Sequence, residues 1–155
     1  MLEFVFNAKK RKDDVVKVVV FRDKKDWTDE KLAKNVGLPT MTALMKIANN
    51  ENFKPEGEAC LKLYVGVTPY ILFHLAEDNP LKSGKKLYGI IKKYMNADIY
   101  MAGVKEDVLE KFLLGIENAN YSFDKYCTKK KAEDFDKLET VNVIGAKKPN
   151  VEKIA

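Results

Sequence analysis

The run at residues 15–21, VVKVVVF, restricts the fold of this chain more than any other segment. It is apolar at every position but Lys17, and β-branched valine favours extended backbone. A nearly continuous apolar run of this length is typical of a strand that is covered on both faces. Residues 2–6 alternate in polarity and are predicted to be its partner strand, joined to it by the charged turn at residues 7–14.

A helix is predicted after this strand. Thr28 is expected to be its N-cap, because a hydroxyl oxygen there can accept a bond from an unpaired backbone N–H. Trp27 and Leu32 have the spacing of a hydrophobic staple around that cap. Gly37 suits the position after the last helical residue, so the helix is expected to end near Val36.

The rest of the chain alternates between helical and strand-like patterns. The expected elements are a helix at 40–49, a hairpin of strands at 59–65 and 70–75 around the turn 66–69, a helix from Asn79-Pro80 to about Asn96, a strand at 98–103, a long helix with Val108, Phe112, Ile116, Ala119 and Phe123 on one face, and a last strand at 140–144. This order mixes a hairpin with strand–helix–strand crossovers. The fold class it predicts is α/β with three layers, a mixed β-sheet with helices on both faces.

A chain of 155 residues fits one domain, which we assign to residues 1–145, followed by a linker-like stretch at 146–155. No window reaches the ~18 consecutive apolar residues of a membrane span, and the first residues do not resemble a signal peptide. The two cysteines, Cys60 and Cys127, are too few for a disulfide framework. A cytoplasmic location is therefore expected.

Catalytic signatures are scarce. His74 is the only histidine, which excludes an HExxH metal site, and its place in an apolar strand favours a structural, hydrogen-bonded role. Cys127 lies near several lysines that would lower a thiol pKa, yet a buried, unreactive cysteine is the favoured interpretation. No glycine-rich phosphate loop is present, and Gly84 and Gly89 are interpreted as sites of close helix packing.

Two basic clusters are the candidate nucleic-acid contacts. The net charge is +5, and lysines need nothing more specific than charge to neutralise phosphates. No aromatic residues interleave with the clusters to stack bases, so solvated surface turns are the simpler interpretation. The candidate residues are Lys9, Lys10, Arg11, Lys12, Lys129, Lys130 and Lys131.

One segment resembles a known family. The apolar stretch at 112–115 leads into YSFDKYCTKKK at 121–131, which is similar to the end of the N-terminal domain in the leucyl (cytosol) aminopeptidase family of metallopeptidases. The resemblance is sharp over residues 112–131 and loose from residue 15 onward. The family has a glycine-rich turn after the second hairpin strand, whereas residues 72–77 read LFHLAE here.

The resemblance implies a non-catalytic domain with a macro-domain-like fold. In that family the catalytic residues and two divalent metal ions, zinc or manganese, lie in a following C-terminal domain around an NTDAEGR signature, a string that this chain lacks. No catalytic, cofactor-binding or metal-binding residue is therefore expected here. The implied partners are that C-terminal domain and further copies in a hexamer, with roles in assembly, access control or regulation, and DNA in some bacterial members.

An alternative from another class stays open: a free-standing macro-like module that binds a nucleotide or nucleic acid. The linker-like stretch at 146–155 favours the aminopeptidase interpretation, and the lack of a glycine-rich phosphate loop counts against the alternative.

Overall fold

The computed structural model describes residues 2–7, 15–23, 26, 29–53, 60–126 and 138–146, with side chains described to residue 120 in the longest helix. Within these ranges the strands are β1 (Glu3–Phe6), β2 (Val15–Phe21), β3 (Cys60–Val65), β4 (Thr68–His74), β5 (Asn96–Tyr100) and β6 (Thr140–Ile144). The helices are α1 (Glu30–Val36), α2 (Leu38–Asn50), α3 (Pro80–Ile91) and α4 (Glu106–Tyr126).

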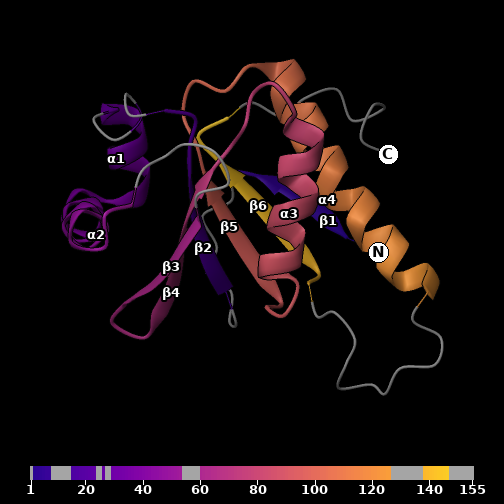
Figure 1. The fold of residues 1–155 in the computed structure, drawn as a ribbon, viewed down its shortest axis with the longest axis horizontal. Helices are drawn as coiled ribbons and strands as arrows, with labels where there is room; N and C mark the ends of the chain where they lie inside the picture. Colours follow the sequence, from indigo (N-terminus) through magenta and orange to yellow (C-terminus); the bar gives the residue numbers. More distant parts are fainter. Residues whose placement is uncertain are drawn as a thin grey trace.

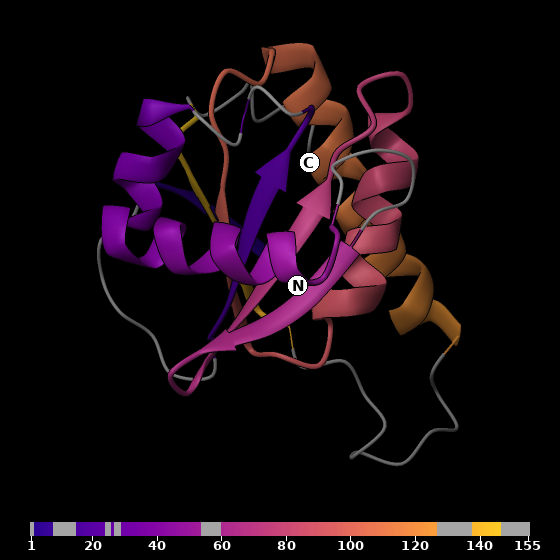
Figure 2. The ribbon, with the colours of Figure 1, turned by 60° about the vertical axis from the view of Figure 1, so that its left-hand side comes forward.

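The strands form one mixed sheet in the order β1-β6-β5-β2-β4-β3. All neighbours are parallel except the hairpin partners β3 and β4, which are antiparallel as predicted. Helices α1 and α2 cover one face of the sheet, and α3 and α4 cover the other (Figure 1). Turning the molecule brings α2 in front of β2, β3 and β4, with α1 beside it (Figure 2). The predicted three-layer α/β fold is confirmed.

Strand β2 is covered on both faces, as its sequence requires. Val16, Val18 and Val20 point into the core under α3 and α4, whereas Val19 and Phe21 point into the core under α1 and α2. Each of these side chains is almost fully buried. The continuous apolar run therefore supplies both cores from one central strand.

The prediction that residues 2–6 pair with β2 is wrong. Strand β1 pairs in parallel with β6 at the sheet edge, with Phe4 opposite Val141, and the neighbours of β2 are β4 and β5. Strands that are close in sequence usually pair as an antiparallel hairpin. Strand β1 instead forms a parallel pair with β6, which is far from it in sequence. The half-buried side chains of β1 suit an edge, while the mostly buried β2 suits a position with a paired strand on each side.

The N-cap of α1 differs from the prediction. Asp29, not Thr28, is the N-cap, and its carboxylate accepts hydrogen bonds from the backbone N–H groups of Lys31 at 2.8 Å and Leu32 at 3.1 Å. Trp27 lies outside the described residues, so the staple stays a prediction. Helix α1 ends at Val36 as predicted, and the N–H of Gly37 (φ 105°) donates to the carbonyl of Ala33 at 2.8 Å.

The end of α3 also differs from the prediction. Asn79 caps the helix, with its side-chain oxygen accepting from the N–H of Lys82 at 3.3 Å, and Pro80 takes the first position as predicted. The helix stops at Ile91, however, and Asn96 opens β5. The apolar stripe continues past the helix because Tyr94 packs against the same core from the following turn.

Helices α3 and α4 touch backbone to backbone. A Cβ on Gly84 would overlap the carbonyl oxygen of Phe112, and one on Gly115 would overlap the carbonyl oxygen of Leu81. Close packing at Gly84 is therefore confirmed. The same interpretation is wrong for Gly89, where a Cβ would meet nothing within 4 Å.

The predicted apolar face of the long helix is confirmed over the described side chains. Val108, Phe112 and Ile116 are buried in the core under α3 and α4, and Ala119 packs against it. The side chain of Phe123 lies outside the described residues.

Candidate functional site

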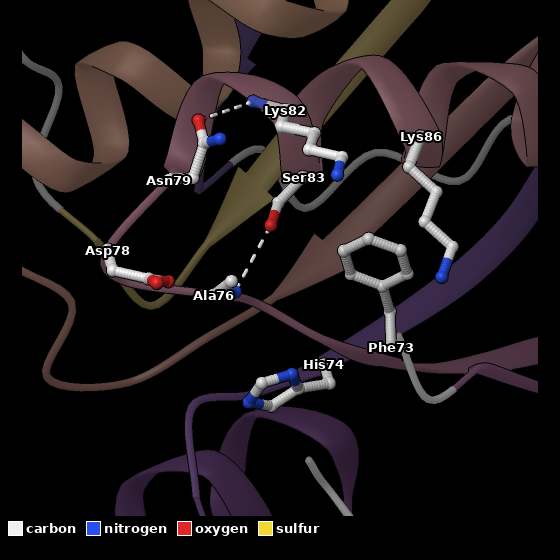
Figure 3. A pocket seen from close by; sticks show the side chains of 8 residues that line it. All are labelled: Phe73, His74, Ala76, Asp78, Asn79, Lys82, Ser83 and Lys86. Atoms are coloured by element: carbon white, nitrogen blue, oxygen red, sulfur yellow. Dashed lines mark hydrogen bonds between the residues drawn. The ribbon is translucent and has the colours of Figure 1, made fainter. Parts of the chain in front are cut away.

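A small cavity opens where β4 ends and α3 begins (Figure 3). Its volume is about 210 Å³. Its walls come from the end of β4, the connecting loop and one side of α3. The lining residues are Phe73, His74, Ala76, Asp78, Asn79, Lys82, Ser83 and Lys86. Carboxyl ends of parallel strands are the usual place for ligands in open α/β sheets, so we treat this cavity as the candidate site.

Backbone hydrogen bonds hold the loop that shapes the cavity. After β4, the N–H of Leu75 donates to the carbonyl of Phe21 at 2.9 Å, which keeps the chain beside β2. The N–H of Ala76 then donates to Ser83 Oγ at 3.1 Å. The Ser83 side chain is buried, with 7% of its surface exposed. This contact holds the loop against the first turn of α3.

His74 is hydrogen-bonded, as the sequence predicted. Its Nε2 lies 3.0 Å from the carbonyl oxygen of Arg22. Since a carbonyl oxygen only accepts, Nε2 is the nitrogen that carries the proton. Arg22 is itself held by Asp26, through bonds of 3.0 Å from Nε and 2.8 Å from Nη2, and it donates to the carbonyl of Gly103 at 2.7 Å. His74 therefore joins β4 to a network that ties β2 to the loop after β5.

The cavity has charges of both signs and an apolar wall. Lys82 and Lys86 extend from α3, Phe73 lies on the β4 side, and Asp78 lies on the loop (Figure 3). Neither Lys82 nor Asp78 forms an ion pair with another residue in the described part of the chain. Ligand pockets for drug-sized molecules typically span ~300–1,000 Å³, so this cavity suits a smaller molecule than a nucleotide.

A second polar cluster lies inside the sheet. Lys17, Asp98 and Asn142 occupy one row across β2, β5 and β6. The Asn142 side chain donates to Asp98 at 3.4 Å, and Lys17 Nζ lies 6.0 Å from the Tyr100 ring centroid. Burial, followed by the nearby Asp98 carboxylate, raises the pKa of Tyr100. Asp98 and Asn142 are joined by a hydrogen bond and Lys17 lies near an aromatic ring, so we assign the row a structural role.

The basic residues singled out in the sequence cannot be placed. Lys9, Lys10, Arg11, Lys12, Lys129, Lys130 and Lys131 all lie outside the described residues, as does Cys127. Their role in nucleic-acid binding stays a prediction. Cys60 is an exposed thiol on the edge strand β3. Desolvation raises its pKa although the charge of Lys86 opposes this, so the thiol stays protonated at neutral pH.

Sequence reasoning missed a cluster of lysines and tyrosines. Lys62 Nζ on β3 lies 5.6 Å from the Tyr64 ring centroid and 5.5 Å from that of Tyr94, which follows α3. Lys93 Nζ lies 5.7 Å from the Tyr94 centroid. Tyr64 is 57% exposed. The alternation of Lys62 and Tyr64 on an edge strand was the available signal, but their meeting with Lys93 and Tyr94 depends on the fold.

The described residues contain no group of three or more His, Cys, Asp or Glu side chains placed to hold a metal ion. No helix among them is long and apolar enough to cross a membrane.

Comparison with known proteins identifies the fold. No family model matches the chain, and no curated protein matches it in sequence. Among solved structures, the chain is similar to a lysine-to-glutamate mutant of tomato leucine aminopeptidase, with a TM-score of 0.69 and 12% sequence identity. The match covers 99% of this chain and 35% of the tomato enzyme chain. This chain therefore has the fold of a part of leucine aminopeptidase and spans about a third of that enzyme's length.

Proposed function

We propose that this chain is the non-catalytic N-terminal domain of a leucyl aminopeptidase-type metallopeptidase. The observation that carries the proposal is the fold match, which includes nearly all of this chain but only 35% of the tomato leucine aminopeptidase. The YSFDKY segment at residues 121–126 supports it independently, because it resembles the end of that family's N-terminal domain.

In this proposal the chain serves assembly, access control or regulation in the cytoplasm. Its partners are a C-terminal catalytic domain and further copies in a hexamer. The two divalent ions of such an enzyme do not fit the described residues, since these offer no group of three potential ligands. A two-metal hydrolase needs carboxylates gathered around ions ~3.5–4 Å apart, and we assign that chemistry to the other domain.

The proposal predicts that the 155-residue chain alone hydrolyses no peptide. The purified chain would be assayed on leucine amide substrates with added zinc, manganese or cobalt. A longer protein that carries the downstream domain serves as the positive control. We expect turnover only from the longer protein. Metal-dependent turnover by the short chain that survives repurification would overturn the proposal.

A second function, a module that binds single-stranded nucleic acid, is favoured by the cluster of Lys62, Tyr64, Lys93 and Tyr94. Such proteins combine positive charge with aromatic side chains on which bases stack. The hydrogen bond with Tyr94 is the main cause that raises the pKa of Lys62, so this lysine keeps its charge at neutral pH. The cavity at β4, in contrast, is too small to support a nucleotide-binding version of this function.

This second function predicts that Tyr64→Ala combined with Lys62→Ala weakens binding of a short oligothymidine about tenfold or more, since stacking contributes ~1–3 kcal/mol per base. Binding would be measured by fluorescence anisotropy at several salt concentrations. Because the Lys62→Ala change removes one contact to a phosphate, the binding constant should also depend less steeply on salt concentration. The control, Lys31→Ala with Lys34→Ala, removes exposed charges from α1. Equal losses in the two double variants would reject the Lys62–Tyr64 surface as the binding site.

A further inference from the structure

The cavity between β4 and α3 combines features that match a molecule with two opposite charges. We propose that it binds a free α-amino acid in its zwitterionic form. The inference rests on the cavity and its lining residues, not on the proposed peptidase role.

The carboxylate of the ligand is matched by donors on α3. Lys82 forms no ion pair with another described residue, and it lines the cavity. Ser83 Oγ accepts a bond from Ala76, which leaves the hydroxyl hydrogen able to donate. Asn79 uses its side-chain oxygen in the helix cap, which leaves its amide NH₂ as a further donor. A charged lysine and neutral donors together are the usual partners of a carboxylate.

The ammonium group of the ligand is matched by Asp78. This carboxylate lies on the loop across from the lysines, and it too has no ion-pair partner among the described residues (Figure 3). The opposite placement of Asp78 and Lys82 argues against a phosphate, which would be repelled by Asp78. A neutral ligand would leave both charges without a counter-charge. A zwitterion satisfies both at once.

The remaining wall suits an apolar side chain. Phe73 and Ala76 are the apolar residues that line the cavity beside the charged groups, and Ala76 provides most of their exposed surface because Phe73 is only 1% exposed. A volume of about 210 Å³ admits a small molecule of amino-acid size and lies below the range for larger ligands. We therefore expect apolar amino acids such as leucine to bind better than charged ones.

The test is isothermal titration of the purified full chain with L-leucine. Two analogues each remove one charge: leucinamide lacks the carboxylate, and 4-methylpentanoate lacks the ammonium group. We expect L-leucine to bind and each analogue to bind about twofold to fivefold more weakly, because each leaves one exposed protein charge unmatched. Inorganic phosphate, the third probe, is expected not to compete. If L-leucine gives no saturable binding, or if phosphate binds and leucine does not, the proposal is overturned.

Substitutions then locate the site. Asp78→Asn and Lys82→Met should each weaken leucine binding about twofold to fivefold, since each removes one exposed charged partner. The matched controls are Glu77→Gln and Lys85→Met, which change exposed neighbours that do not line the cavity and should leave binding unchanged. Asp78 and Lys82 are exposed as well, so thermal unfolding should be unaffected in all four variants. Leucine binding that survives both test substitutions would overturn the assignment of the site.

These experiments measure only amino-acid binding and not peptide hydrolysis. A negative binding result would therefore not contradict the proposed peptidase role, and a negative peptidase assay would not contradict the amino-acid site.

Discussion

Gly84→Ala is expected to lower the free energy of unfolding by at least about 3 kcal/mol, near the upper end of what overpacking a core usually costs. The added methyl group would overlap the carbonyl oxygen of Phe112 and crowd the Cα of Gly115. These are backbone atoms inside two packed helices, so no side-chain rotation can relieve the overlap. Helices α3 and α4 would have to separate along the whole contact, which would loosen the core beneath them.

Gly89→Ala is the matched control on the same helix. A Cβ there meets nothing within 4 Å, and Gly89 is exposed. Alanine in a helix interior is favoured over glycine by roughly 0.5–1 kcal/mol, so this variant should be slightly more stable than the parent chain. Urea unfolding followed by circular dichroism would measure both. Similar midpoints for the two variants would show that the contact between α3 and α4 is looser than described.

The architecture could be predicted because its strongest signals are local. The run at residues 15–21 required a layer on each face, and the spacing of Val108, Phe112 and Ile116 identified one buried helix face. The partner of β1 could not be predicted in the same way. In parallel pairing the partners are far apart in sequence, as Phe4 and Val141 are here. The pattern of a single strand does not specify which distant strand it joins.

The candidate site was harder to predict from the sequence than the architecture, because its residues come together only in the fold. The sequence identified Asn79 as a helix cap and His74 as a hydrogen-bonded strand residue, and both interpretations are confirmed. Nothing in the local pattern indicated that Asp78 and Lys82 would face one cavity, because that requires the end of β4, the loop and α3 to be placed together. A charged side chain usually lies in solvent at the protein surface, so its residue type alone gives no means of finding the exception.

Phe112→Ala is expected to lower the free energy of unfolding by roughly 3–5 kcal/mol, a large part of the ~5–15 kcal/mol that stabilises a typical domain. The Phe112 side chain is fully buried, and its ring lies against Phe73, with centroids 6.3 Å apart and planes inclined by 40°. Truncation would remove this aromatic contact and leave a cavity between α4 and the centre of the sheet. Neither β4 nor α4 can move in to fill it, because β4 is paired on both edges and α4 is held at Gly84 and Gly115.

The neighbouring Lys111→Ala provides the control, since Lys111 is exposed on the same turn of α4 and surface substitutions usually change stability by less than ~0.5 kcal/mol. Phe112→Leu should lie between the two, because it keeps an apolar side chain but loses the ring contact. Denaturant midpoints compared at constant slope would give the order Lys111→Ala, Phe112→Leu, Phe112→Ala from most to least stable. If Phe112→Ala unfolds at the same denaturant concentration as Lys111→Ala, then α4 packs with a different face and the core described beneath it is wrong.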